Sequence, residues 1–390
     1  MDRQIYLDNS ATTKICDAAL EKYIEVSREC YGNPSSLHAM GFDAERVLNT
    51  ARDEIRTSLG AKDAEIVFTA SGSEANNLAI IGRALSKDRY RKGAKIIITE
   101  GEHASVSEPV SKLEAMGFKV ARIPTRGGKL DTGVLIQELT RDVILVSMMM
   151  VNNETGALYD TATVARLMRT SSPEAYLHVD ATQSYLKLPF TKASCGADLI
   201  TLSSHKIEGP KGVGALVIDK RVIKERGLSA LILGGGQESG LRSGTENVPG
   251  IAAFGTAVAI GRANLRERNA KMNELRSYFI EKLNTLPGLS EISVTLPQSH
   301  APHIINVTLP KIKSETMLHY LSSFGIYVSS GSACSSNSGH VSSALTAYGR
   351  SEAEADSSIR ISLSYKNTTE ELDELLRVMA EGTSKLSRMK

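Results

Sequence analysis

The chain has 390 residues, of which 41% are hydrophobic, and it carries 46 basic and 44 acidic side chains for a formal net charge of +2. A chain of this length is expected to form about two to three domains, or one large α/β unit with a smaller companion. The balanced charge, without a block of five like charges, gives no electrostatic case for nucleic acid or an anionic membrane as partner, and the hydrophobic content excludes an intrinsically disordered chain.

The cell compartment is indicated by two features. The longest apolar stretches, such as 143–151, fall far short of the ~18 residues that a membrane-spanning helix needs, and the first ten residues are too polar for a secretory signal. The four cysteines form no CxxC pair, which argues against a disulfide framework and a structural zinc site. We therefore expect a cytoplasmic protein without a membrane span or a bound metal.

Short apolar runs alternate with helical segments between residues 60 and 220. Because several runs are apolar at consecutive positions, they are typical of strands buried on both faces, as in a mostly parallel sheet covered by helices. The sequence therefore predicts a doubly wound α/β domain of about seven strands, at 65–69, 95–99, 118–123, 142–149, 175–180, 198–202 and 213–218.

A second, smaller α/β domain is expected beyond residue 260. Apolar residues recur every three, four or seven positions from 249 to 284, which predicts one long amphipathic helix leading out of the large domain. The Gly-rich stretch 234–247 carries charges and is expected to be an ordered functional loop. We assign residues 16–260 to the large domain, and 1–15 with 261–390 to the small one.

Lys206 and Asp180 are the strongest candidates for catalysis. Lys206 lies in SSHKIEGPKG, directly after a predicted strand, at the edge of the sheet where α/β folds bind ligands. Asp180 ends the preceding predicted strand. A lysine that forms a Schiff base and a carboxylate that keeps a pyridine nitrogen protonated are what pyridoxal phosphate requires. The alternatives are a surface lysine and a helix N-cap aspartate.

Two further strand ends carry polar groups. Small residues at Ser71, Gly72 and Ser73 open a predicted helix and suit a phosphate, although the Ser–x–x–Glu spacing to Glu74 is equally a capping box. His103 follows another strand and is a candidate to lie over a planar cofactor or to move a proton, unless it is structural.

Cys334 lies in SSGSACSSNSG, residues 329–339, a run with almost no apolar side chains. This composition predicts an exposed loop, and a thiol on such a loop is a candidate nucleophile that must travel. The alternative is an incidental surface cysteine.

With these residues in place, the sequence resembles the NifS/IscS-type cysteine desulfurases, pyridoxal-phosphate enzymes of the class V aminotransferase fold. The resemblance spans nearly the whole chain, and its motifs occur in that family's order: YLDNSATT, YGNPSS, FTASGSEANN, EHAS, VNNETG, HVDATQ, SSHKIEGPKG, RSGTEN, SSGSAC and SIRISL. It implies a fold-type I transferase. Two departures, Ser335 and Ser73 where threonine is common, both keep a hydroxyl.

The resemblance also implies roles for single residues. Lys206 would hold pyridoxal 5'-phosphate, Asp180 would contact its ring nitrogen, Gln183 its phenolic oxygen, and His103 would stack on its ring. The phosphate would be bound by Ser73, Ser203 and His205, next to Gly72, and by Thr245 of the partner subunit of a homodimer. Asn153 and Arg360 would contact the substrate carboxylate, and Cys334 would accept the sulfur.

The function that the resemblance implies is conversion of L-cysteine to L-alanine, with the sulfur left as a persulfide on Cys334. The sulfur would then pass to an acceptor protein, for iron–sulfur cluster assembly or another thiolation. The alternatives are a selenocysteine lyase or other carbon–sulfur lyase, a true aminotransferase, and an inactive scaffold that binds iron–sulfur assembly partners.

Overall fold

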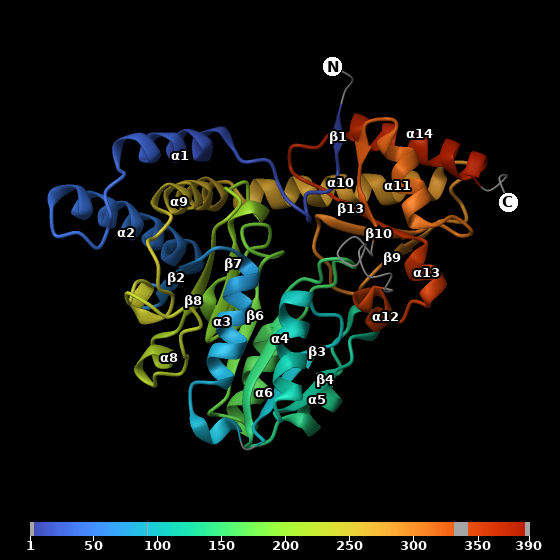
Figure 1. Ribbon diagram of the computed structural model, residues 1–390. Helices are drawn as coiled ribbons and strands as arrows, with labels where there is room; N and C mark the ends of the chain where they lie inside the picture. Colours follow the sequence, from blue (N-terminus) through green and yellow to red (C-terminus); the bar gives the residue numbers. More distant parts are fainter. Residues whose placement is uncertain (1–3, 92, 331–341, 387–390) are drawn as a thin grey trace.

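A seven-stranded sheet forms the centre of the larger half of the protein (Figure 1). The computed structural model describes residues 4–91, 93–330 and 342–386. The strands lie in the order β2-β8-β7-β6-β5-β3-β4. Their bounds are β2 Glu65–Thr69, β3 Lys95–Thr99, β4 Lys119–Ile123, β5 Val143–Met149, β6 Tyr176–Asp180, β7 Leu199–Ser203 and β8 Gly214–Ile218.

The sheet is mostly parallel, so the predicted fold class is confirmed. Strands β7, β6, β5, β3 and β4 pair in parallel, whereas β8 runs antiparallel to both of its neighbours, β7 and β2. The seven predicted strands agree with the observed ones to within a residue at each end. Side chains alternate between two cores: Val146 packs in one and Leu145 in the other.

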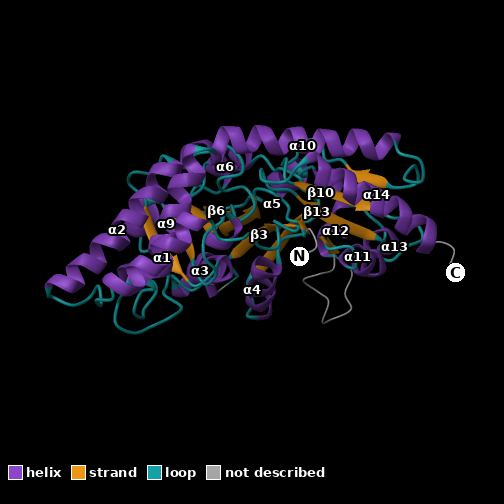
Figure 2. Ribbon diagram, turned by 90° about the horizontal axis from the view of Figure 1, so that it is seen from above, coloured by secondary structure: helices purple, strands orange, loops and turns teal. Residues whose placement is uncertain are grey.

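Helices cover both faces of this sheet. Helices α3 and α4 share a core with one face, and α2, α6 and α9 share a core with the other, so the sheet lies between two helical layers (Figure 2). The helices of this half are α1 Asp17–Glu29, α2 Ala39–Leu59, α3 Gly72–Ala84, α4 Ala104–Ala115, α5 Thr132–Glu138, α6 Thr161–Ser171, α7 Lys192–Cys195, α8 Lys220–Lys224 and α9 Val248–Ala263. Short 3-10 turns are η1 Asp88–Arg91, η2 Arg126–Gly128, η3 Ser204–Lys206 and η4 Glu238–Gly240.

The smaller half has its own core around a four-stranded antiparallel sheet, ordered β12-β13-β10-β9. The N-terminal strand β1 joins this half by pairing in parallel with β11, and Ile5 and Leu7 pack in its core. The exact boundaries of the two predicted domains stay a prediction. The elements are β1 Ile5–Tyr6, α10 Leu265–Thr285, β9 Ser293–Thr295, β10 Ile304–Thr308, α11 Ser314–Ser322, β11 Ile326–Tyr327, β12 Ser329–Ser330, α12 Ser343–Tyr348, α13 Glu352–Asp356, β13 Ser358–Ser362 and α14 Thr369–Leu386.

The prediction of one helix over 249–284 is wrong, because the chain breaks at Asn264 between α9 and α10. Asn264 has φ −110° and ψ 9°, and its side-chain amide donates to the carbonyl of Ile260 at 2.9 Å. An asparagine side chain that bonds to the backbone competes with the regular helical ladder. Helix α10 then crosses into the smaller half (Figure 1).

No helix in the described part of the chain is long and apolar enough to cross a membrane. The four strands β3, β5, β6 and β7 all end at the same edge of the large sheet, facing the smaller half. Such an edge is where parallel α/β sheets bind ligands.

Candidate active site

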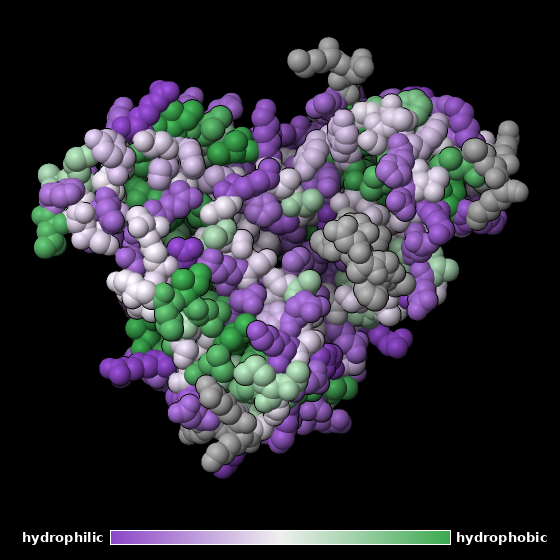
Figure 3. Space-filling model, viewed as in Figure 1, coloured by the Kyte–Doolittle hydropathy of each residue, from purple (hydrophilic) through white to green (hydrophobic). Residues whose placement is uncertain are grey.

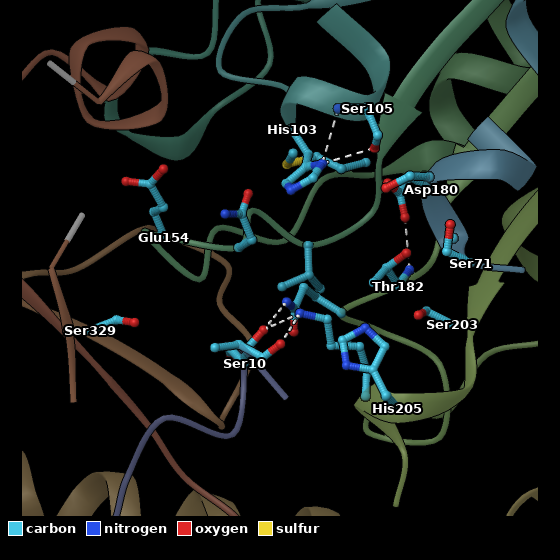
Figure 4. Close-up of a pocket in the computed structure, with 18 of the residues that line it drawn as sticks. Ser10, Ser71, His103, Ser105, Glu154, Asp180, Thr182, Ser203, His205 and Ser329 are labelled. Carbon is cyan, nitrogen blue, oxygen red and sulfur yellow. Dashed lines mark hydrogen bonds between the residues drawn. The ribbon is translucent and has the colours of Figure 1, made fainter. Parts of the chain in front are cut away.

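A cavity of about 460 Å³ lies where these strands end (Figure 4). The large half supplies one wall, and residues of the N-terminal segment, β12 and β13 supply the other. Figure 4 shows Glu154 and Ser329 on the opposite side of the cavity from Asp180 and Thr182. Ten sequence-predicted site residues line it: Gly72, Ser73, His103, Asn153, Asp180, Gln183, Ser203, His205, Lys206 and Arg360.

Lys206 ends the 3-10 turn that directly follows β7. Its Nζ donates to the backbone carbonyls of Ser10 at 2.5 Å and Ala11 at 2.8 Å. Both acceptors belong to the N-terminal segment that crosses from the smaller half. Carbonyl oxygens of this segment therefore hold the amine at the cavity wall.

Asp180 is the last residue of β6, and its carboxylate is buried at the cavity edge. One oxygen accepts from the Asn76 side-chain amide at 2.8 Å and the other from the backbone N–H of Thr182 at 2.9 Å. No helix begins after Asp180, so it is not a helix N-cap. An ionised carboxylate has about four acceptor sites, which leaves capacity for a further donor from the cavity.

The start of α3 forms a concave surface built from backbone and small side chains. Ser71 is the N-cap and accepts from Glu74 N–H at 3.2 Å, while the Glu74 carboxylate accepts from Ala70 N–H at 2.8 Å. A Cβ on Gly72 would lie 3.2 Å from the Ser203 Cβ and 3.3 Å from the Thr182 hydroxyl oxygen. Ser71 and Glu74 therefore cap α3, and the N-terminus of α3 nevertheless stays open to the cavity.

Gly214 explains why β8 can run so close to this helix start. A Cβ at Gly214 would lie 2.5 Å from the carbonyl carbon of Ser71 and 2.8 Å from the nitrogen of Gly72. Real Cβ atoms do not approach backbone that closely, so only glycine leaves the α3 N-terminus in place.

His103 is the N-cap of α4, and its Nδ1 accepts from the backbone N–H of Ser105 at 3.1 Å. Burial lowers its pKa, as do Lys206 and Arg360, while Asp180 acts in the opposite direction. The ring is thus favoured in its neutral form, with the remaining proton on Nε2.

Glu102 directly precedes His103 in the chain and is a buried carboxyl group. Its Oε1 accepts from Met149 N–H at 2.9 Å and from the Thr99 hydroxyl. Burial raises its pKa to about 8. This protonated carboxyl group joins the end of β3 to the end of β5, next to His103 in the chain and bonded to Met149, both of which line the cavity.

The wall opposite Asp180 carries a guanidinium. Arg360, on β13, donates to the Asp8 carboxylate at 2.9 Å and to the backbone carbonyl of Asn153 at 3.0 Å. Next to it, Glu154 accepts from the Ser342 hydroxyl at 2.5 Å, and burial raises the Glu154 pKa to about 7. This side of the cavity thus carries the Arg360–Asp8 ion pair, bordered by the Glu154 carboxyl group, which titrates near neutrality.

His205 and the loop with Thr245 complete the predicted set. His205 Nδ1 lies 3.1 Å from the Thr12 hydroxyl, and burial together with nearby lysines lowers its pKa to about 4. Thr245 is exposed and does not line the cavity of its own chain. Its loop is tethered by an ion pair between Arg242 and Glu74 at 3.0 Å. Cys334 lies outside the described residues.

Sequence reasoning missed several residues here. Asp8, Asn76, Glu102, Glu154 and Lys187 make contacts with predicted site residues or the cavity wall. Asp8 stands in YLDNSATT and Glu154 in VNNETG, so both motifs offered a signal. Within the described ranges, no group of three or more His, Cys, Asp or Glu side chains could hold a metal ion.

Comparisons with known proteins place the chain in a family. The aminotransferase class-V family matches residues 5–375. A "NifS/IcsS protein homolog" from Lactobacillus delbrueckii subsp. bulgaricus is 38% identical over 97% of this chain and 96% of its own length. A "Cysteine desulfurase IscS" from Dictyoglomus turgidum is 36% identical over 99% of this chain and 96% of its own.

Solved structures agree with these relatives. A "NIFS-LIKE PROTEIN" superposes with a TM-score of 0.90 at 36% identity, covering 98% of this chain and 100% of its own. "SspA in complex with cysteine" gives a TM-score of 0.79 at 31% identity, covering 93% and 100%. With the fold, the cavity and matches over the full length all in agreement, this chain belongs to the class V aminotransferases, among the NifS/IscS-type proteins.

Proposed function

We propose that this protein is a pyridoxal-phosphate-dependent cysteine desulfurase that converts L-cysteine to L-alanine. The observation that carries the proposal is that Lys206, Asp180 and Arg360 line one cavity from three different elements. Relatives named cysteine desulfurase, and a structural neighbour solved with cysteine, support the same activity.

The residues of the cavity fit pyridoxal 5'-phosphate. The exposed N-terminus of α3, with Ser73, Ser203 and His205 around it, suits a phosphate, because helix N-H groups and hydroxyls are donors to anions. A side chain at position 72 would occupy this space, because its Cβ would already lie 3.2 Å from the Ser203 Cβ. When bound, the cofactor supplies an electron-withdrawing ring that accepts the electron pair left at the substrate Cα.

In this proposal Lys206 attaches the cofactor and later holds the proton taken from the substrate Cα. Asp180, fixed by Asn76 and Thr182, would hold the ring nitrogen of the cofactor and favour its protonated form. The neutral His103 ring, fixed through Nδ1 and lining the cavity, would contact the cofactor ring there.

Arg360 and Asn153 bind the substrate carboxylate in this account. The guanidinium is already oriented by Asp8 and by the Asn153 carbonyl, so little rotamer freedom remains to be lost on binding.

The sulfur step involves Cys334, which the sequence indicates as the nucleophile. The substrate carbon–sulfur bond breaks, a sulfur–sulfur bond forms on Cys334, and the substrate Cβ takes up a proton, so that a thiol plus cysteine gives a persulfide plus alanine. The persulfide then passes to an acceptor protein, an iron–sulfur scaffold or a thiolation enzyme.

A homodimer is part of the proposal. Thr245 lies outside its own cavity, in agreement with a role at the partner's phosphate. Hydrophobic side chains gather over α1 at the upper left of Figure 3, and such a patch suits a second copy of the chain. The exposed residues of this region and of the segment before Thr245 are Leu20, Tyr23, Ile24, Tyr31, Leu37, Met40, Phe42, Ile232 and Leu233.

We also place the enzyme in the cytoplasm. The cysteines in the described part of the chain, Cys16, Cys30 and Cys195, are free thiols, which supports a reducing compartment.

Borohydride trapping tests the cofactor assignment. Protein loaded with pyridoxal phosphate, then reduced and digested, should carry the label on Lys206. Lys187, a buried lysine of the same region, serves as the internal control and should stay unlabelled. A colourless protein with no label on Lys206 would contradict the proposal.

A further inference from the structure

Lys187 is a buried lysine behind the cavity that the proposed chemistry leaves unused. It follows Gln183 by four residues and is 8% exposed. Its Nζ donates to the Gln183 Oε1 at 3.3 Å, and Asn269 holds its backbone carbonyl at 2.8 Å. Over residues 4–91, 93–330 and 342–386 it makes no salt bridge.

Lys187 and Lys206 both line a small cavity of about 40 Å³. The carboxylate that lines it, Glu208, already pairs with Arg268 at 3.3 Å and Lys366 at 2.5 Å, and it accepts from Tyr365 at 2.9 Å. Lys187 therefore lacks the counter-ion that a buried ammonium requires.

The other groups that influence Lys187 are cationic or neutral. Burial, and after it the positive charges of Lys206 and Arg360, lower the Lys187 pKa to about 7. Burial, together with nearby charges that include Lys187, lowers the pKa values of His205 and His303. Both imidazole rings are therefore neutral. A residue so costly to bury is expected to have a specific task.

The hydrogen bonds around Gln183 indicate that task. The Gln183 Nε2 donates at 2.9 Å to the Ser10 carbonyl, which also accepts from Lys206 at 2.5 Å. The Ser10 carbonyl can only accept, so it takes the Nε2 side of the amide, and the Lys187 side chain carries N–H donors for the oxygen side in either protonation state. Ser10 on one side and Lys187 on the other therefore fix the same orientation of the amide.

We propose that Lys187 is a positioning residue that locks the Gln183 amide with its N–H₂ group beside Lys206 and facing the cavity. The inference rests on the proposed function, in which this donor lies at the phenolic oxygen of pyridoxal phosphate. Donation to that oxygen weakens its hold on the proton of the lysine-linked nitrogen. The protein-bound cofactor then loses this proton at a lower pH.

The test titrates the protein loaded with pyridoxal phosphate and measures the pH at which its visible absorption band is half converted. Lys187→Met, which keeps the length and apolar stem, should raise this midpoint by about one pH unit. Lys187→Arg, which still donates to Oε1, should keep the wild-type midpoint. Urea unfolding of the unloaded variants checks that each one folds.

A double-mutant cycle separates the amide from the charge of Lys187. In a Gln183→Leu background, Lys187→Met should no longer move the midpoint. An equal shift with and without Gln183, or no shift in Lys187→Met alone, would overturn the inference. Absence of any visible band in the wild type would instead count against the proposed cofactor.

Discussion

Replacing Glu102 with glutamine should stabilise the unloaded protein at neutral and alkaline pH and change its stability little at acid pH. Glu102 is 5% exposed, and its carboxyl group accepts from Met149 N–H at 2.9 Å and from the Thr99 hydroxyl. Its second oxygen has no partner among the described residues. Glutamine keeps the accepting oxygen and removes the ionisable group.

The magnitude follows from proton linkage. The Glu102 pKa is raised from 4.5 to about 8 by burial, so the unfolded chain ionises in a range where the folded protein stays protonated. The free energy of unfolding therefore falls as the pH rises from the unfolded pKa to the folded one, by about 1.4 kcal/mol per pH unit. From pH 4.5 to 7 this contribution amounts to about 3 kcal/mol.

Urea unfolding of wild type and Glu102→Gln between pH 4.5 and 8.5 measures the effect. The difference between the two proteins should grow with pH and level off near pH 8. Glu100→Gln, which changes a partly exposed carboxyl in the same turn, is the matched control. A Glu102→Gln difference that is constant across this range would refute the reasoning.

Three further predictions concern the cavity walls. Gly214→Ala places a Cβ 2.5 Å from Ser71 backbone and should lower the free energy of unfolding by about 1–3 kcal/mol in urea titrations, whereas an unchanged midpoint would contradict the close approach. Arg360→Lys loses one of the two hydrogen bonds that orient the guanidinium. It should raise the KM for L-cysteine by about tenfold to a hundredfold, measured by alanine formation. An unchanged KM would show that Arg360 does not belong to the substrate site. Mixing inactive Lys206→Ala and Thr245→Ala proteins should restore activity through shared sites, and no recovery after proven subunit exchange would argue against Thr245 acting across an interface.

The large sheet could be predicted from the sequence because its strands are buried on both faces. Runs such as KIIIT and DLITL are apolar at consecutive positions, which distinguishes them from amphipathic helices. The break at Asn264 could not be found this way, since the apolar spacing continues on both sides of it. A side chain that bonds to its own backbone changes the local geometry without changing the hydrophobic pattern.

Site residues that directly follow strand ends could be predicted from the sequence. Site residues whose pKa values are shifted by burial could not. Lys206, Asp180 and His103 were found because parallel strands end at one edge. Glu102 and Lys187 were missed, because a charged residue in a sequence is expected at the surface and only the fold reveals that these two are buried. The pairing of Asp8 with Arg360 joins residues 352 positions apart, a distance over which local patterns carry no information.

Mass spectrometry of the protein after incubation with L-cysteine tests the central claim most directly. The account predicts alanine as product and one additional sulfur on the peptide that contains Cys334, with the peptides of Cys16, Cys30 and Cys195 unchanged. Cys334→Ala should still bind L-cysteine and change the visible spectrum, but it should release no alanine. Alanine released at the wild-type rate by Cys334→Ala would contradict the account, because a lyase that needs no acceptor thiol would then explain the chemistry.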